Sequence, residues 1–238
     1  MLNWIFPCVC ELCGAPAKRY ICDQCVADLP YICPPICMYC GTPTQGAQDD
    51  PYRCPACSGR ARSFDFARSA LKMSESTRQL IHRLKYKRGN YLAPSMALIL
   101  NQLWEKTPAL MERNDWWLIP VPSGTAHLYS RGYNQAEELA CCLGRLRGLG
   151  LLSPLKRLKK GADSQTHLAA SQRWRNALSS FVLRSAWANG HRKLPPHLVL
   201  VDDVYTTGST VRACAHLLKQ LPGVKTVAVL TLIRAVHG

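Results

Sequence analysis

Residues 199–210 read Val-Leu-Val-Asp-Asp-Val-Tyr-Thr-Thr-Gly-Ser-Thr, and this stretch decides the fold. The apolar run 198–201 has the length and β-branching of a buried strand. Asp202 and Asp203 come at its end, and a short loop of hydroxyls with one glycine leads into a helical pattern. Backbone N–H groups at the beginning of a helix have no partner inside it, so they can hold a phosphate dianion. This order predicts a cradle for a sugar phosphate, with the acidic pair at the hydroxyls of a ribose.

The segment resembles the 5-phosphoribosyl-1-pyrophosphate (PRPP) signature of the type I phosphoribosyltransferases. In that family the two acids bind the ribose 2- and 3-hydroxyls, and the loop binds the 5-phosphate. The resemblance implies that Asp202 and Asp203 are both PRPP-binding and catalytic. It implies a phosphate loop made of Thr206, Thr207, Gly208, Ser209 and Thr210. The alternative interpretation is a solvated strand-to-helix turn with an accidental acidic pair.

Other segments predict a parallel α/β sheet around this motif. Residues 64–71, 116–122 and 224–233 have strand patterns, and helical patterns run over 77–84, 91–104 and from a cap at Asn134. The alternation of strand and helix is typical of βαβ units, whose ligands lie at the carboxyl ends of the strands. The loops 123–132 and 206–210 would share that edge. In phosphoribosyltransferases the first loop binds pyrophosphate, which makes Arg131 the best candidate contact here, with His127 a weaker one.

Cysteine is concentrated at the beginning of the chain, where ten of the thirteen lie in the first 57 residues. They include four Cys-x-x-Cys pairs, and two such pairs supply the tetrahedral sulfur set of a structural zinc site. The spacing predicts a double zinc ribbon with two zinc ions, one held by Cys10, Cys13, Cys22 and Cys25 and the other by Cys37, Cys40, Cys54 and Cys57. Iron–sulfur and redox-dithiol sites are the alternatives, and Cys8 and Cys33 remain unassigned.

The composition indicates a basic protein with anionic partners. The chain has 238 residues, 47% of them apolar, and a formal net charge of +15. Such an excess favours nucleotides, phosphosugars or nucleic acid as partners. No apolar run is long enough to span a membrane, and no basic leader precedes the first cysteines. We therefore expect a cytoplasmic protein without membrane insertion, with a double zinc ribbon over residues 1–60 and a phosphoribosyltransferase-like domain over 61–238.

Three features together narrow the resemblance to one family. They are the early Cys-x-x-Cys pairs, the run Arg-Gly-Tyr-Asn-Gln at 131–135, and the PRPP motif, with Gln165, Leu168, Arg173, Asn176 and Phe181 spaced between the last two. This layout resembles the ComF family of amidophosphoribosyltransferase-like competence proteins. The resemblance implies an α/β type I phosphoribosyltransferase fold with a parallel sheet and an N-terminal zinc ribbon. It also implies a role in natural competence, in the handling of incoming single-stranded DNA beside a helicase partner.

Two functions remain open at this point. One is an enzyme that binds PRPP with Mg²⁺ and transfers its pentosyl group to an unidentified acceptor. The other is a non-catalytic adaptor that senses PRPP or binds DNA, and recruits a helicase through its zinc ribbon. The basic segment 156–175 is interpreted as a mobile lid over PRPP, a solvated loop or a surface that faces DNA.

Overall fold

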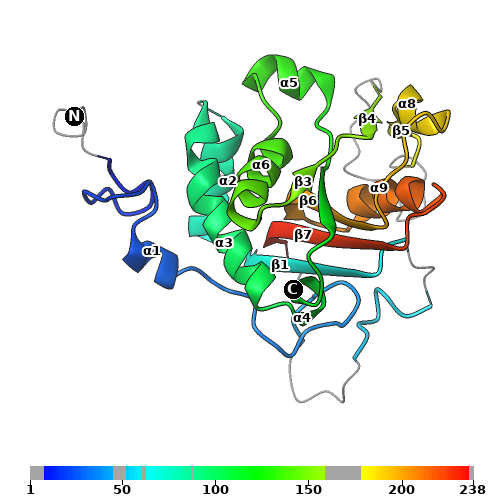
Figure 1. Ribbon diagram of the computed structural model, residues 1–238. Coiled ribbons are helices and arrows are strands. Elements are labelled where there is room, and N and C mark those ends of the chain that lie inside the picture. The colour runs from blue at the N-terminus through cyan, green and yellow to red at the C-terminus, as the bar shows by residue number, and fades with distance from the viewer. Residues whose placement is uncertain (1–7, 45–51, 60–62, 87, 159–177, 236–238) are drawn as a thin grey trace.

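The computed structural model describes residues 8–44, 52–59, 63–86, 88–158 and 178–235 (Figure 1). Within them, five strands form one sheet in the order β1-β7-β6-β2-β3, and every neighbouring pair is parallel. This arrangement confirms the predicted parallel α/β fold. The strand bounds are β1 Phe66–Lys72, β2 Trp116–Pro120, β3 Gly150–Leu151, β6 His197–Tyr205 and β7 Thr226–Arg234.

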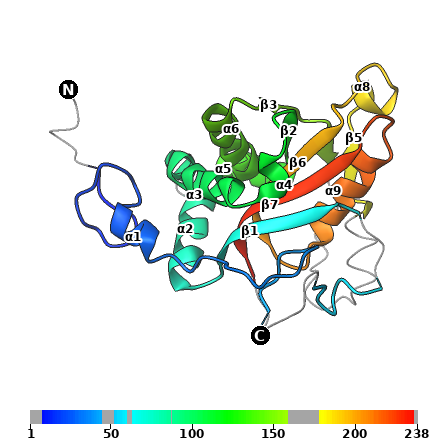
Figure 2. The ribbon, with the colours of Figure 1, turned by 60° about the horizontal axis from the view of Figure 1, so that its bottom comes forward.

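Helices cover both faces of the sheet. Helices α3 (Ala93–Glu105) and α6 (Gln135–Arg147) pack on one face together with α2 (Glu75–Lys85), and α9 (Ser209–Lys219) packs on the other (Figure 2). Successive side chains of a strand point to opposite faces, so β6 feeds both layers. Val199 and Val201 join the core beneath α3 and α6, whereas Leu198 and Leu200 join the core beneath α9. Burial on both faces explains why β6 is continuously apolar from Leu198 to Val201.

The remaining elements are short. Strands β4 and β5 pair antiparallel, apart from the main sheet. Their bounds and those of the small helices are α1 Asp23–Ala27, a 3₁₀ turn Gly89–Leu92, α4 Pro108–Met111, α5 Thr125–Arg131, β4 Leu155–Arg157, β5 Phe181–Leu183 and α8 Ser185–Ala188. Among the described residues, no helix is both long and apolar enough to cross a bilayer.

Two sequence-based boundaries differ from the structure. Strand β6 continues to Tyr205, so Asp202 lies inside the strand, because the ladder with β7 pairs it with Thr231. The segment predicted as a loop, 123–132, contains helix α5, which ends at Arg131 and is followed by Gly132 with a left-handed φ of 81°. The predicted cap at Asn134 is confirmed, since its side chain accepts a hydrogen bond from the Ala136 N–H at 3.2 Å.

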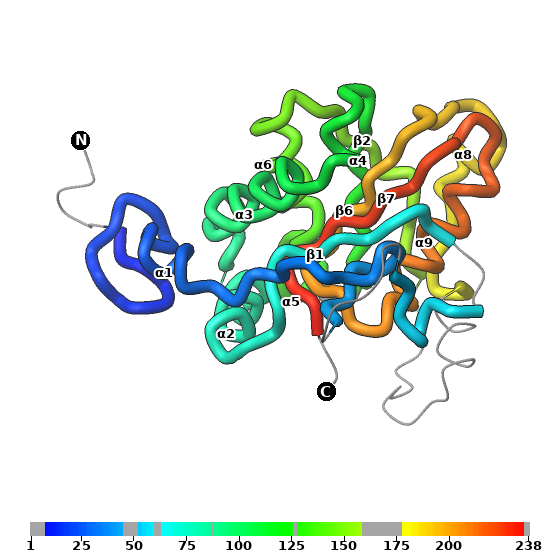
Figure 3. The backbone as a smooth tube through the Cα atoms, turned by 90° about the horizontal axis from the view of Figure 1, so that it is seen from below, coloured from blue at the N-terminus to red at the C-terminus, as the bar shows by residue number. Residues whose placement is uncertain are grey.

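The two cysteine-rich segments lie in different surroundings. The first, at residues 8–29, sits beside α2 and α3 at one end of the molecule, and the second runs along the edge of the sheet at β1 (Figure 3). The Ala67 N–H donates to the carbonyl of Tyr39 at 2.7 Å, and Arg234 Nη1 donates to the carbonyl of Cys40 at 2.7 Å. The second segment thus packs in the same core as α9 and the sheet. The domain boundary between residues 60 and 61 stays a prediction.

Candidate functional site

A pocket opens at the carboxyl ends of β2 and β6. After β2 the chain adds its next strand, β3, on one side, whereas after β6 it adds β7 on the opposite side. The direction in which strands are added therefore reverses between β2 and β6. In open α/β sheets this switch point is where ligands bind. The cavity there measures about 380 Å³, within the range of small-molecule sites. Among its lining residues are five predicted site residues, namely Arg131, Asp202, Asp203, Thr206 and Thr210.

The acidic pair is held in a defined geometry. Asp202 Oδ1 accepts from the Asp203 N–H at 2.9 Å, and Asp203 Oδ1 accepts from the Val204 N–H at 3.0 Å. Burial raises the pKa of Asp202, and the neighbouring Asp203 carboxylate raises it further, against a smaller opposing effect of Lys85. A buried carboxyl group with a raised pKa, in a pocket and beside a second carboxylate, is typical of a functional site rather than of a solvated turn.

The phosphate loop forms the turn into α9. Gly208 takes a left-handed φ of 74°, and a Cβ there would collide with the Tyr205 hydroxyl. Thr207 Oγ1 and Ser209 Oγ lie 3.0 Å apart beside it. The helix begins at Ser209 and has no side-chain cap, so its first N–H groups stay available to a ligand. Thr206 and Thr210 line the cavity, whereas Thr207, Gly208 and Ser209 are not among its lining residues.

Arg131 lies across the pocket from this turn. It ends α5, donates from Nη1 to Gln135 Oε1 at 3.3 Å, and has its guanidinium 5.1 Å from the Tyr86 ring centroid. Arg131 Nε and Gln135 Nε2 are buried and find no hydrogen-bond partner among the described residues. Buried donors are normally satisfied, so two orphaned donors on the wall of one cavity indicate a missing acceptor such as a phosphate oxygen. The side chain of His127 falls outside the described part.

Two further cations line the pocket, of which the sequence left one, Lys85, unassigned, whereas the other, Arg157, falls in the predicted lid segment 156–175. Lys85 at the end of α2 places its Nζ 2.7 Å from Asp203 Oδ2. Arg157 in β4 reaches the pocket with its guanidinium 5.4 Å from the Phe181 ring centroid. Both come from elements far from the PRPP motif in sequence, so no local pattern connects them with it. The predicted lid at 156–175 lies mostly outside the described residues.

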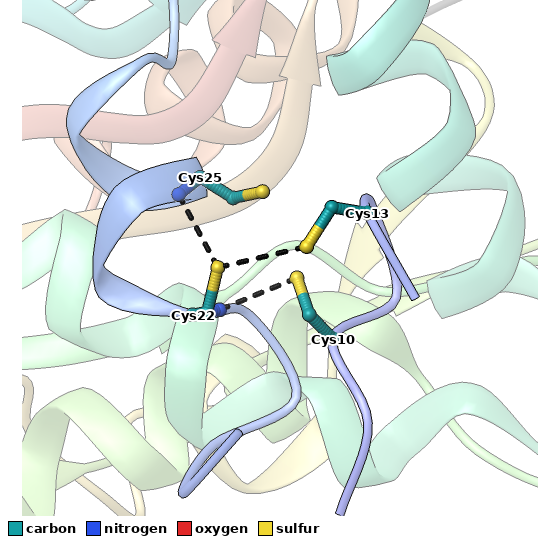
Figure 4. A group of neighbouring side chains, drawn as sticks. All are labelled: Cys10, Cys13, Cys22 and Cys25. Carbon is teal, nitrogen blue, oxygen red and sulfur yellow. Dashed lines mark hydrogen bonds between the residues drawn. The ribbon is translucent and has the colours of Figure 1, made fainter. Parts of the chain in front are cut away.

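Eight cysteines gather into the two groups that the spacing predicts. In each group the four sulfur atoms lie within 4.8 Å of one another, and those of the first converge in Figure 4. Zinc–sulfur bonds of about 2.3 Å in a tetrahedron require sulfur atoms about 3.8 Å apart. The distances are 3.8 Å between Cys13 and Cys22 and 3.6 Å between Cys40 and Cys54. Both groups therefore fit zinc, and within the described residues Cys8 and Cys33 belong to neither.

Backbone donors lower the pKa of one thiol in each group, Cys10 in the first and Cys37 in the second. Burial alone raises the pKa of Cys10, but N–H groups of Cys22, Cys13 and Leu12 outweigh it and lower the pKa to about 6. The Cys22 N–H, for example, lies 3.4 Å from the Cys10 sulfur. A thiol with a lowered pKa is largely thiolate at neutral pH, which is the form that binds zinc.

Comparisons with known proteins agree with this arrangement. The double zinc ribbon domain family matches residues 1–58. The DNA utilization protein YhgH of Salmonella typhimurium is 29% identical, over 96% of this chain and 97% of that protein. Competence protein F of Haemophilus influenzae is 29% identical, over 92% of each chain, and competence protein ComFC of Bacillus subtilis is 26% identical, over 90% of this chain and 84% of its own. The chain is a homologue of these proteins.

This homology confirms the resemblance to ComF-type proteins, and the structure shows what its hallmark run does. Arg131 and Gln135 line the pocket, while Asn134 holds the loop that follows β2. Asn134 Oδ1 accepts from Ser123 Oγ at 2.7 Å, and its Nδ2 donates to the Val121 carbonyl at 3.0 Å. The spaced residues from Gln165 to Phe181 end in β5, and most of them lie outside the described residues.

Proposed function

We propose that this protein binds PRPP in the pocket between β2 and β6 and acts in natural competence, in the cytosolic handling of incoming single-stranded DNA. The observation that carries the PRPP proposal is the meeting of three groups in one cavity. These are an acidic pair, the uncapped beginning of α9, and cations that include Arg131. The competence role rests on relatives that are named competence and DNA utilization proteins.

PRPP matches these groups part by part. Its 5-phosphate suits the N–H groups at the beginning of α9, where the helix dipole favours an anion. Its ribose hydroxyls suit Asp202 and Asp203, and its diphosphate supplies acceptors for the orphaned donors of Arg131 and Gln135. Mg²⁺ would arrive with PRPP and neutralise part of the diphosphate charge, with Asp202 and Asp203 as its nearest acidic groups.

Calorimetric titration of the zinc-loaded protein with PRPP and Mg²⁺ tests this proposal. We expect saturable binding that is lost in the Asp202→Asn, Asp203→Asn double variant. The variant should keep its zinc content and a cooperative melting transition, because both asparagines retain an oxygen that can accept the backbone hydrogen bonds. Wild-type affinity in the double variant would overturn the site assignment.

Release of pyrophosphate separates an enzyme from a sensor. A phosphoribosyltransferase positions the acceptor and stabilises positive charge on the ribose as pyrophosphate leaves, so it releases pyrophosphate once the right acceptor is present. A sensor binds PRPP without release. Screening bases, amines and nucleic acids as acceptors against the same double variant therefore decides between the two functions.

Contact with nucleic acid is a second candidate function, favoured by the surface beside the first zinc ribbon. Tyr20 and Tyr91 are 39% and 36% exposed there, and their rings lie 4.5 Å apart. Exposed rings among cations are the usual platform for single-stranded nucleic acid. The adaptor alternative, in which the ribbon recruits a helicase, would use this same end of the molecule.

A further inference from the structure

Lys85 is the ion-pair partner of the acidic pair. Its Nζ lies 2.7 Å from Asp203 Oδ2, the lysine side chain is 28% exposed, and the aspartate side chain is 12% exposed. No hydrogen bond of good geometry reaches that oxygen among the described residues. The contact is thus a charge pairing rather than a directional bond. Two adjacent carboxylates that leave water need such a counter-charge, because each disfavours the ionised form of the other.

The first zinc ribbon holds the end of α2 from which Lys85 projects. Arg83 in the same turn forms an ion pair with Glu11, which lies between the ligands Cys10 and Cys13. Glu11 also accepts from the Tyr91 hydroxyl at 2.7 Å, and its carbonyl accepts from Gln79 Nε2 at 3.0 Å.

The pocket side fixes the same turn of α2. The Tyr133 hydroxyl donates to the carbonyl of Leu84, which is fully buried. The backbone next to Lys85 is therefore held from the ribbon on one side and from the pocket on the other. These contacts on both sides of α2 therefore position the Lys85 ammonium group at the cavity.

We propose that Lys85 is a PRPP-binding residue that neutralises Asp203 in the empty pocket and pairs with the diphosphate when PRPP binds. The inference rests on the proposed function and deepens it. Once the ribose hydroxyls and Mg²⁺ approach the two carboxylates, the Lys85 ammonium group leaves Asp203 and pairs with the diphosphate. A lysine is suited to this transfer because its ammonium is a compact charge with three rotatable donors on a flexible stem. Arg131 and Arg157 line the same cavity and complete the cationic wall.

Three ligands separate this role from a structural one. We would titrate wild type, Lys85→Met and Lys85→Arg with PRPP, inorganic diphosphate and ribose 5-phosphate, each with Mg²⁺. The matched control is Arg78→Met, because Arg78 lies on the same helix, is exposed and pairs only with Glu75. We expect Lys85→Met to bind PRPP and diphosphate at least about tenfold more weakly, the loss typical of one charge-assisted contact. Its affinity for ribose 5-phosphate should stay within about threefold of wild type.

The variants also guard against simple misfolding. Lys85→Arg should recover much of the affinity for PRPP and diphosphate, and Arg78→Met should match wild type for all three ligands. Equal PRPP affinity in Lys85→Met and wild type would overturn the role of Lys85 and leave the proposed function standing. An equal loss for all three ligands, together with a lower melting temperature, would show a structural role and also overturn it. Failure of wild type to bind any of the three would instead overturn the proposed function itself.

Discussion

At the scale of single residues, the burial of Asp202 beside Asp203 works against the stability of the empty protein at neutral pH. Burial and the neighbouring Asp203 raise its pKa, so the folded state disfavours the ionised form. A group whose pKa is raised on folding contributes stability below its unfolded pKa, and that contribution is lost as the pH rises through the folded pKa. Asp202 therefore contributes less to folding stability at neutral pH than at acidic pH, as expected of a carboxyl group kept for ligand binding.

Replacing this charge should stabilise the empty protein. Asp202→Asn keeps an oxygen for the Asp203 N–H and removes the repulsion. We expect its melting temperature at pH 7 to rise by about 2–4 °C, the shift that about 1 kcal/mol produces in a domain of this size. The gain should shrink as the pH is lowered from 7 toward the unfolded pKa of an aspartate, about 3.9. Asp28→Asn, an exposed change away from the pocket, is the control. A lower melting temperature of Asp202→Asn at pH 7 would contradict the argument.

Gly208 supports a second residue-scale prediction. Gly208→Ala must place a side chain at a φ of 74° and against the Tyr205 hydroxyl, so it should destabilise the fold by about 2 kcal/mol and weaken PRPP binding. Gly190→Ala is the matched control, because Gly190 has the same φ of 74° and open space around the added methyl group. Thermal melting and PRPP titration check both variants. The prediction fails if the two variants melt and bind alike.

At the scale of elements, the two zinc ribbons differ in how much of the fold depends on them. In the first group only Cys10 is buried, whereas in the second Cys37, Cys40 and Cys54 are all buried in the core beneath α9. Arg234 of β7 binds the Cys40 carbonyl, which ties the second ribbon to the sheet. The first ribbon contacts the rest of the chain through fewer buried side chains, among them Ile21 and Leu29.

Single ligand replacements should expose this difference. Cys25→Ser and Cys57→Ser should each reduce the zinc content from two ions per chain to one, since each breaks one four-sulfur set. We expect Cys57→Ser to lower the melting temperature of the whole protein by more than Cys25→Ser does. Metal analysis and calorimetric melting provide the measurement. A larger effect of Cys25→Ser would show that the first ribbon is the main support of the fold.

Features that follow from a local order of residues can be predicted from the sequence, whereas features that depend on packing between distant elements cannot. Asp202, Asp203 and the turn at Gly208 follow a local order of residue types, so the candidate cradle was visible without a structure. The length of β6 was not, because the ladder with Thr231 depends on a distant strand. Lys85 was missed as a pocket residue for the same reason, since only the packing of α2 against the sheet brings it to Asp203. Helix α5 was missed because its seven residues have no apolar stripe of helical period.

At the scale of the whole molecule, the net charge of +15 sets the expected response to salt. Two zinc centres with four thiolates each would lower it by 4, to about +11, which is still strongly basic. Binding to single-stranded DNA then releases counterions, and the logarithm of the affinity falls linearly with the logarithm of the salt concentration. The slope is about −0.7 for each phosphate neutralised.

Titration of a thymidine oligonucleotide across a range of salt concentrations tests this expectation with two variants. Arg88→Ala removes one exposed cation beside the tyrosines and should make the slope shallower by about 0.7. Tyr20→Ala removes a stacking ring and should weaken binding at every salt concentration with an unchanged slope, by about 1–3 kcal/mol if a base stacks on it. An affinity that does not change with salt would exclude the DNA contact. Unchanged binding in both variants would place it elsewhere on the basic surface.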